Sequence, residues 1–287
     1  MRRKFIFIVN PIAGDGYNIK RLNALIELYK SVYDFKIIET KRREPIRNYI
    51  GSIDRKSLIV AVGGDGTVNA VAQYCYETNR PMSIIGLGSG NGLARHLELN
   101  LDPFLAFKQI LNGKERKIDI GFLNKVCFFN VAGLGFDGYV AHLFDIDKKR
   151  GLLAYVKAFI KALNEFKSFH FELDIDGTII NSKGFLITIA NGSQYGNNIF
   201  IAPEAKLNDG LFDIVILKYI GWRNLLYLIL KMRSKKLAKS KSVSYFKGKK
   251  IIINKFECNH AHIDGEPMLL KSSSSIELVA DGLTIIK

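Results

Sequence analysis

The chain has 287 residues, of which 48% are hydrophobic and 24% are charged, values typical of a globular protein large enough for two domains. Its formal net charge of +15 favours nucleic acid, an anionic membrane surface or a phosphate-rich molecule as partner. The three cysteines fit no metal or disulfide spacing, which indicates reduced thiols in a cytosolic protein. The apolar stretch from Phe5 to Val9 is too short for a signal peptide, and no apolar run approaches the ~20 residues that span a bilayer.

Strand-like and helix-like segments alternate through the first part of the chain. Apolar runs predict strands at 4–9, 35–40, 57–62 and 82–87, and helical spacing predicts helices at 18–32, 44–53 and 68–77. This alternation predicts an α/β domain with a parallel, doubly wound sheet. In such sheets ligands bind beyond the carboxyl ends of the strands.

The second part of the chain is rich in strand-like runs separated by Gly, Asn and Asp. Strands are predicted at 125–133, 170–178, 183–192, 211–220, 249–256 and 274–287, with helices at 151–166 and 221–239. We therefore predict two domains, an α/β domain at 1–123 and a β-rich domain at 124–287.

Four segments that follow predicted strands suit the binding of phosphate. They are NPIAG (10–14), Thr40, GGDGT (63–67) and GLGSGNG (86–92). On one edge of one sheet, their backbone N–H groups and the helix N-termini behind them would form an anion-binding surface. The alternative, that each is only a tight turn, explains one or two of them but not the carboxylate of Asp65.

Asp65 raises a problem of charge, because a carboxylate among phosphate-binding glycines would repel a nucleotide. A Mg²⁺ ion between them would remove the conflict. Asp119 is a candidate second carboxylate, although a solvated Asp at a strand end explains it about as well. The loops contain no Walker A motif. GLGFDG (133–138) matches G-x-G-x-x-G, but a helical pattern follows where a dinucleotide site needs a second strand, so we interpret it as a turn.

Five motifs occur in the order of a known family: NPIAG, GGDGTVNAVA, GSGNGLARHL, APEAKLNDGLFDIVIL and HIDGEP. The chain resembles the diacylglycerol kinase catalytic-domain family, which includes bacterial soluble diacylglycerol kinases and, more distantly, sphingosine and ceramide kinases. The resemblance covers nearly the whole chain. It implies an ATP-binding α/β domain followed by a β-sandwich domain.

The resemblance also implies roles for particular residues. Asp65 and Asp119 match an acidic network around catalytic Mg²⁺, whereas Gly92 stands where the family pattern has a further Asp, a departure shared with the GSGN loop of sphingosine kinases. Asp209 would give a carboxylate, and Lys206 and Leu211 backbone carbonyls, to a second metal site; without the resemblance, a plain hairpin turn is preferred there. The residues implied to bind ATP are Asn10, Pro11, Ile12, Ala13, Gly14, Thr40, Gly63, Gly64, Asp65, Gly66, Thr67, Val68, Asn69 and Ser89.

In HIDGEP, Asp264 and Glu266 are two residues apart and would face the same side of an extended segment. Phosphoryl transfer to a hydroxyl needs a base, and a carboxylate takes this role in kinases. The resemblance favours Glu266 as the base with Asp264 supporting it, and Asp65 is the rival. His260 and His262 are given no role.

The segment 221–240 combines Trp and Leu at helical spacing with many Lys and Arg residues. A core helix would bury the apolar stripe, but the density of cations also suits a helix that lies on an anionic membrane, and we favour the membrane.

Together these features predict an ATP- and Mg²⁺-dependent lipid kinase, cytoplasmic and peripherally membrane-associated, with diacylglycerol as the first expected acceptor. A sphingoid-base kinase is the alternative, and a non-catalytic nucleotide- or lipid-binding sensor is the third. Nucleic-acid binding is not expected, because no aromatic-studded recognition motif accompanies the charge. The acyl chain, the effect of Gly92 and a homodimer are left open.

Overall fold

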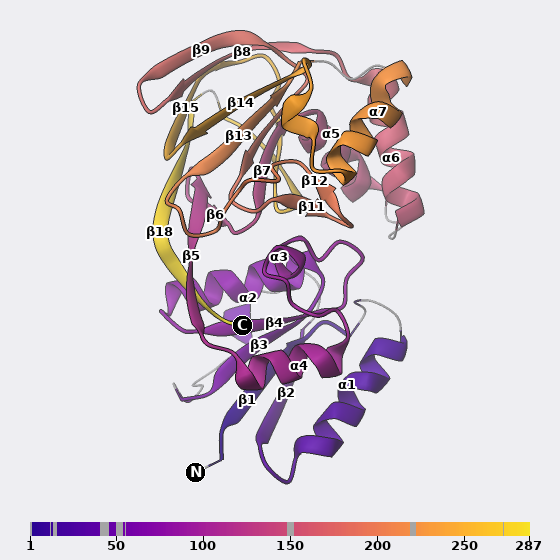
Figure 1. The fold of residues 1–287 in the computed structure, drawn as a ribbon, viewed down its shortest axis with the longest axis vertical. Helices are drawn as coiled ribbons and strands as arrows, with labels where there is room; N and C mark the ends of the chain where they lie inside the picture. The colour runs from indigo at the N-terminus through magenta and orange to yellow at the C-terminus, as the bar shows by residue number, and fades with distance from the viewer. Residues whose placement is uncertain are drawn as a thin grey trace. The chain divides into compact units, whose positions relative to one another are not determined.

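Figure 1 shows the fold of the chain as a computed structural model. The structure describes residues 2–11, 13, 16–40, 46–49, 54, 56–147, 152–218, 222–271 and 273–287, without the side chains of 16–19, 152 and 222–225. The chain divides into two compact units, one made of Met1–Ile118 with Asp281–Lys287 and the other of Asp119–Ala280. The division lies close to the predicted boundary. The prediction of one boundary did not anticipate that the last residues, Asp281–Lys287, belong to the first unit.

The first unit contains a parallel sheet with the strand order β2-β1-β3-β4, as the sequence predicts. The end of β18 (Ser274–Ile286) extends this sheet, with Ile285 opposite Met82 of β4. The other elements are β1 (Lys4–Val9), α1 (Gly16–Tyr29), β2 (Asp34–Glu39), a 3-10 turn η1 (Ile46–Asn48), β3 (Leu58–Gly63), α2 (Asp65–Glu77), β4 (Met82–Gly86), α3 (Gly92–His96) and α4 (Pro103–Asn112), and β5 (Glu115–Leu123) crosses the division between the units.

Helices cover both faces of this sheet, α1 and α4 on one side and α2 on the other (Figure 1). One core cluster joins Phe5 and Phe7 of β1 with Leu25 of α1 and Phe107 of α4, all completely buried. The alternation of strands and helices in the sequence therefore positions the strand ends correctly. Of the helix predicted at 44–53, only Ile46–Asn48 is helical among the described residues, and 44–45 and 50–53 lie outside them.

The second unit is built around an antiparallel six-stranded sheet with the order β14-β13-β10-β7-β16-β17. Its elements are β6 (Val126–Phe128), β7 (Val131–Gly135), α5 (Phe136–Ile146), α6 (Leu152–Glu165), β8 (Phe169–Ile175), β9 (Thr178–Gly184), β10 (Leu186–Ala190), β11 (Gln194–Gly196), β12 (Ile199–Phe200), β13 (Phe212–Leu217), α7 (Trp222–Arg233), a 3-10 turn η2 (Leu237–Lys239), β14 (Val243–Gly248), β15 (Lys250–Phe256), β16 (His260–Ile263) and β17 (Glu266–Leu269).

Alternate residues of the six-stranded sheet enter two different cores. Ile214 and Ile216 of β13 pack toward β8, β15 and β18, forming a β-sandwich, whereas Val215 and Leu217 pack toward α5, α6 and α7. The predicted fold class, an α/β domain followed by a β-sandwich domain, is confirmed. Among the residues that the structure describes, no helix is long and apolar enough to cross a membrane.

One interpretation from the sequence is wrong. GLGFDG is not only a turn, since β7 ends at Gly135 and α5 begins at Phe136. Gly135 has a φ of +91°, a conformation that glycine adopts without strain, and this lets the strand pass directly into the helix. Asp137 is thereby placed in the first turn of α5.

His96, at the end of α3, gives the fold a dependence on pH. Burial lowers the pKa of His96 to about 4, and the charge of Lys287 acts in the same direction. The unfolded chain therefore takes up a proton near pH 6.5 that the folded chain takes up only near pH 4, so stability falls as the pH drops through this window, by about 3 kcal/mol. Urea unfolding between pH 7 and pH 4 should show a flatter dependence for His96→Gln than for the wild-type chain; parallel curves would contradict this.

Candidate active site

The parallel register brings the predicted nucleotide-binding residues to one edge of the first unit's sheet. Val9 lies opposite both Glu39 and Val62, and Gly63 lies opposite Gly86, so the four strands end side by side. The residues that follow are held by neighbouring strands: Asn10 N–H donates to Val62 O at 3.1 Å, and Thr40 N–H donates to Val9 O at 2.9 Å. Pro11 and Ala13 belong to the same loop, whereas Ile12 and Gly14 lie outside the described residues.

Two glycine loops meet at this edge with their backbones in contact. A Cβ atom on Gly88 would lie 2.6 Å from the Cα of Gly64, a distance that no real side chain tolerates. Asn91 closes the second loop: its Oδ1 accepts from Gly88 N–H at 2.9 Å, and its Nδ2 donates to Gly88 O at 2.7 Å. Asn91 is buried and left-handed, with a φ of 51°. No role was predicted for Asn91 from the sequence, although Asn often adopts this conformation.

Asp65 connects the two loops. Its Oδ2 accepts from Asn91 N–H at 2.9 Å, and its Oδ1 accepts from Gly92 N–H at 2.7 Å, at the start of α3. These two donors stabilise the negative charge of the Asp65 carboxylate within the protein. A metal ion is therefore not the only group that offsets this charge. Gly92, where the family pattern has Asp, is buried and serves as one of the donors.

The first turn of α2 presents backbone N–H groups of the kind that bind anions. The first N–H groups of a helix have no intrahelical acceptor, and here they include those of Gly66 and Thr67. Val68 differs from the other predicted residues, because its N–H donates to Gly64 O and its side chain is buried. Asn69 is half-buried and Ser89 is exposed. A Cβ on Gly63 would lie 2.6 Å from Thr67 Oγ1, so this glycine lets the Thr67 side chain pack against the strand end.

Replacing Asp65 with alanine should weaken nucleotide binding. The change leaves the N–H groups of Asn91 and Gly92 without their carboxylate, so the second glycine loop loses its order, and we expect an ATP affinity at least tenfold lower. Calorimetric titration with ATP measures the effect. Asp102→Ala is the matched control, because Asp102 also accepts two backbone N–H groups but caps α4. Equal affinities in the two variants would contradict the prediction.

The carboxylates of HIDGEP lie on a two-residue turn between β16 and β17. Ile263 is paired with Glu266, and the φ angles of 47° at Asp264 and 89° at Gly265 define a type I′ turn. Asp264 Oδ1 accepts from the N–H groups of Asn130 and Val131 at 3.0 and 2.8 Å, and its Oδ2 accepts from Phe129 N–H at 2.8 Å. Asp264 therefore fixes the turn to the segment before β7. Glu266 is exposed at the start of β17.

A buried polar chain lies behind this turn. Thr188 Oγ1 is 2.6 Å from Tyr195 OH, Tyr195 OH donates to Asp137 Oδ2 at 3.0 Å, and His262 Nε2 lies 3.2 Å from the same oxygen. Burial and the Asp137 carboxylate raise the pKa of Tyr195 well above its ordinary value, so it remains a donor. The chain ends at His262 Nδ1, which accepts from Gly265 N–H at 3.2 Å. These hydrogen bonds were not predicted from the sequence, where the alternation of His262 with Asp264 and the Asp between the glycines of GLGFDG were the signals for them.

Asp119 is buried at the start of the second unit. Its Oδ2 accepts from Gly210 N–H at 2.7 Å and its N–H donates to Leu207 O at 2.5 Å, so it fastens the KLNDGL loop. Carboxylate oxygens are the ligands that Mg²⁺ prefers, so Asp65 and Asp119 have suitable chemistry, each within its own unit. No group of three or more His, Cys, Asp or Glu side chains suited to a metal occurs in the described part of the chain. The metal assignment stays a prediction.

The predicted second metal site carries an internal cation. Lys247 Nζ lies 3.6 Å from Asp209 Oδ2 and 3.4 Å from Asp213 Oδ1. The Leu211 N–H donates to Asp209 Oδ1 at 3.2 Å. Asp213 is completely buried, and burial raises the pKa of its carboxyl. The position thus attracts positive charge, but a metal ion on Asp209, Lys206 and Leu211 would have to share the carboxylate with the ammonium of Lys247.

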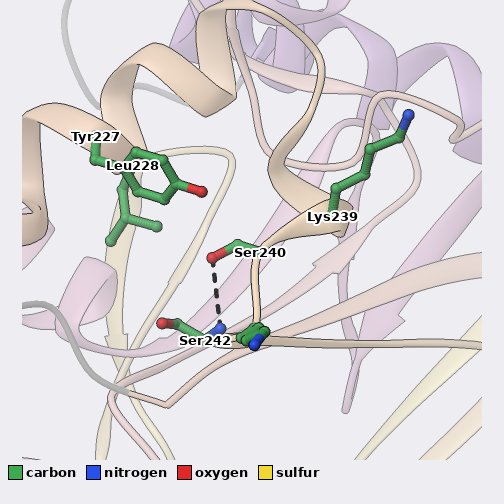
Figure 2. A pocket seen from close by; sticks show the side chains of 6 residues that line it. Tyr227, Leu228, Lys239, Ser240 and Ser242 are labelled. Carbon is green, nitrogen blue, oxygen red and sulfur yellow. Dashed lines mark hydrogen bonds between the residues drawn. The ribbon is translucent and has the colours of Figure 1, made fainter.

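A pocket of about 320 Å³ opens beside α7 (Figure 2). Its lining combines apolar, hydroxyl and cationic groups, and Ser242 N–H donates to Ser240 Oγ at 3.4 Å. The lining residues are Tyr227, Leu228, Lys239, Ser240, Lys241 and Ser242. None of the residues predicted to bind nucleotide or metal, or to act in catalysis, lines it.

Comparison with protein families identifies two domains in the chain. The family model of the diacylglycerol kinase catalytic domain matches residues 4–123, and that of the YegS C-terminal NAD kinase beta sandwich-like domain matches residues 130–286. The first match covers the residues at the strand ends that are predicted to bind nucleotide, and the second covers the β-sandwich. Together the two matches define the class of protein as a nucleotide-using lipid kinase. The chain belongs to the diacylglycerol kinase catalytic-domain family.

Named relatives cover most of the chain. A diacylglycerol kinase of Staphylococcus epidermidis is 29% identical over 277 residues, spanning 93% of this chain and 86% of the relative. A diacylglycerol kinase of Staphylococcus aureus is 28% identical over 280 residues, spanning 93% and 87%. A solved diacylglycerol kinase of Bacillus anthracis strain Sterne aligns with a TM-score of 0.72 at 22% identity, over 99% of this chain and 96% of that chain, and so supports the fold.

Proposed function

We propose that the protein transfers the γ-phosphoryl group of ATP to the hydroxyl of diacylglycerol, giving phosphatidic acid. The observation that carries the proposal is an exposed carboxylate, Glu266, on a turn whose other carboxylate is fully engaged by backbone N–H groups. Family membership supports a lipid kinase, and the relatives named diacylglycerol kinase favour this acceptor.

In the proposed reaction, Glu266 accepts the hydroxyl proton as the lipid oxygen attacks the γ-phosphorus. The new O–P bond forms while the bond to the bridging oxygen breaks, and ADP leaves. The glycine loops and the start of α2 hold the phosphates through backbone N–H groups. Mg²⁺, for which the Asp65 carboxylate at this edge has suitable chemistry, would neutralise the charge that develops on the phosphate oxygens.

The acceptor is tested by measuring transfer from labelled ATP to diacylglycerol and to sphinganine in mixed micelles containing Mg²⁺. Labelled phosphatidic acid as the product supports the proposal. Product from sphinganine alone would favour the sphingoid-base kinase, for which Gly92 in the GSGN loop is the specific observation. Measurable ATP binding without transfer to either lipid would contradict both.

We also propose that the second unit docks on an anionic membrane surface, where its lipid substrate resides. Helix α6 buries Ala154 and Ala158 but exposes 87% of Leu153, an inversion of the usual arrangement. Helix α7 exposes Leu226 and Leu230, 68% and 56% respectively. Exposed cations accompany these faces at Lys157, Lys161, Lys235, Lys236, Lys239 and Lys241, and the last two line the pocket of Figure 2. Apolar side chains among lysines are typical of an interfacial surface.

Replacing Lys236 and Lys239 with alanine should weaken binding to vesicles that contain anionic lipid. At about 1 kcal/mol per cation, the pair contributes about 2 kcal/mol, on the order of 30-fold in affinity, and less at high salt. Vesicle sedimentation measures the loss. Lys108→Ala with Lys183→Ala removes the same charge from exposed positions elsewhere and should have little effect. Equal losses in both double variants would show that only net charge matters.

A further inference from the structure

We infer that His262 is a positioning residue for Glu266: its neutral imidazole, oriented by Asp137, locks the turn that presents the Glu266 carboxylate. The inference rests on the proposed function for the role of Glu266 as the base. The lock itself rests on hydrogen bonds that can be measured without activity.

The lock acts on the middle peptide of the turn. Type I′ and type II′ turns share a positive φ at the first central residue and differ by a flip of the peptide between the two central residues. Here that peptide joins Asp264 to Gly265, and its N–H donates to His262 Nδ1 at 3.2 Å. A flip would point this N–H away from the imidazole and change the direction in which the chain enters Glu266.

Asp137 determines which nitrogen of His262 can act as the acceptor. Its Oδ2 lies 3.2 Å from Nε2, which places the imidazole proton there and leaves Nδ1 with a free lone pair. Both side chains are at least nine-tenths buried. Gly133 of β7 makes room for the pair, because a Cβ there would lie 2.1 Å from Asp137 Oδ2 and 2.3 Å from His262 Nε2.

The turn between β8 and β9 contains the same lock with a different acceptor. Asp176 and Gly177 have φ angles of 48° and 88°, and Gly177 N–H donates to Asp174 Oδ1 at 2.6 Å. Asp174 and His262 occupy the same position, one residue before the paired residue that opens each turn. A recurring acceptor at this position indicates that the contact stabilises the type I′ form.

Charge explains why histidine, rather than aspartate, supplies the acceptor at the turn between β16 and β17. A carboxylate at position 262 would face Asp137 and lie beside Asp264, and such like charges at close range are unfavourable. A neutral imidazole supplies the acceptor without adding charge.

The lock is tested first by NMR on the wild-type chain. The imidazole nitrogen shifts should show a proton on Nε2 and none on Nδ1 at neutral pH. The Gly265 amide should exchange about tenfold faster in His262→Phe, which lacks the acceptor, and remain protected in His262→Gln, which keeps an amide oxygen. The Gly177 amide is the internal reference, unchanged by both variants but released in the matched variant Asp174→Ala.

Kinetics then test positioning. In His262→Phe, kcat should fall about tenfold with the KM for ATP unchanged, and His262→Gln should restore most of it. A proton on Nδ1, or Gly265 exchange unaffected by His262→Phe, would overturn the lock; faster exchange without a change in kcat would overturn the positioning role. A wild-type chain that phosphorylates no lipid refutes the proposed function, whereas the NMR results still decide on the lock.

Discussion

Glu266→Gln should abolish most phosphoryl transfer while leaving the fold intact. Glutamine has the shape of glutamate but cannot accept a proton at neutral pH, and the loss of a general base costs about 10²- to 10⁴-fold in rate. The side chain is exposed on β17, so we expect an unchanged unfolding free energy and unchanged ATP affinity. Transfer of labelled phosphate to diacylglycerol under saturating ATP measures the effect.

Glu277→Gln is the control for this substitution, because Glu277 is also an exposed strand residue of the second unit. It should retain full activity. If Glu266→Gln stayed within a few-fold of the wild-type rate while Asp65→Asn lost it, Asp65 would be the base. The structure argues against that outcome, since both Asp65 oxygens already accept backbone N–H groups.

Asp264→Ala should destabilise the second unit by about 3–5 kcal/mol. Removal of the carboxylate leaves the N–H groups of Phe129, Asn130 and Val131 without an acceptor, and all three residues are at most 7% exposed. Each unsatisfied buried donor costs about 1–3 kcal/mol. Urea unfolding measures the loss, and activity should fall with it because the turn carries Glu266.

Asp176→Ala separates this cost from backbone strain. Asp176 opens the other Asp-Gly turn with nearly the same φ, and its carboxylate accepts from the N–H groups of Lys249 and Lys250, both exposed. Alanine in the left-handed conformation costs the same backbone strain at both turns. The difference in unfolding free energy between the two variants therefore measures the contribution of the buried N–H groups that Asp264 accepts from. Equal losses would show that strain, rather than the three N–H groups, dominates.

The helices and strands could largely be predicted from the sequence, because the spacing of apolar residues and the length of an apolar run depend only on neighbouring residues. Strands β1 to β4 lie within one residue of their predicted bounds, whereas β5 matches no predicted strand. Asn10, Thr40 and Gly64 do follow strands that end together. Helix α4 was missed even though Asp102 caps it and Pro103 is its first residue, a typical helix start.

The contacts within the candidate site could not be predicted, because they depend on pairings between distant segments. Asp65 meets Asn91 and Gly92 only after β3 and β4 align. His262 reaches Asp137 because β16 pairs with β7, which places His262 opposite Gly133. The protonated nitrogen of an imidazole is set by such neighbours, and a sequence does not specify it.

The return of Asp281–Lys287 to the first unit has a consequence for biosynthesis. Ser83 Oγ donates to Ile286 O at 2.7 Å, and Lys114 exchanges backbone hydrogen bonds with Lys287. The ribosome synthesises Ile286 and Lys287 only after it has synthesised the entire second unit. The nascent α/β unit therefore has an open sheet edge beside β4 until synthesis is complete, and an unpaired strand edge is prone to aggregation. A bulky partner fused directly after Lys287 would disturb the first unit, although the fusion point follows the sandwich in the sequence.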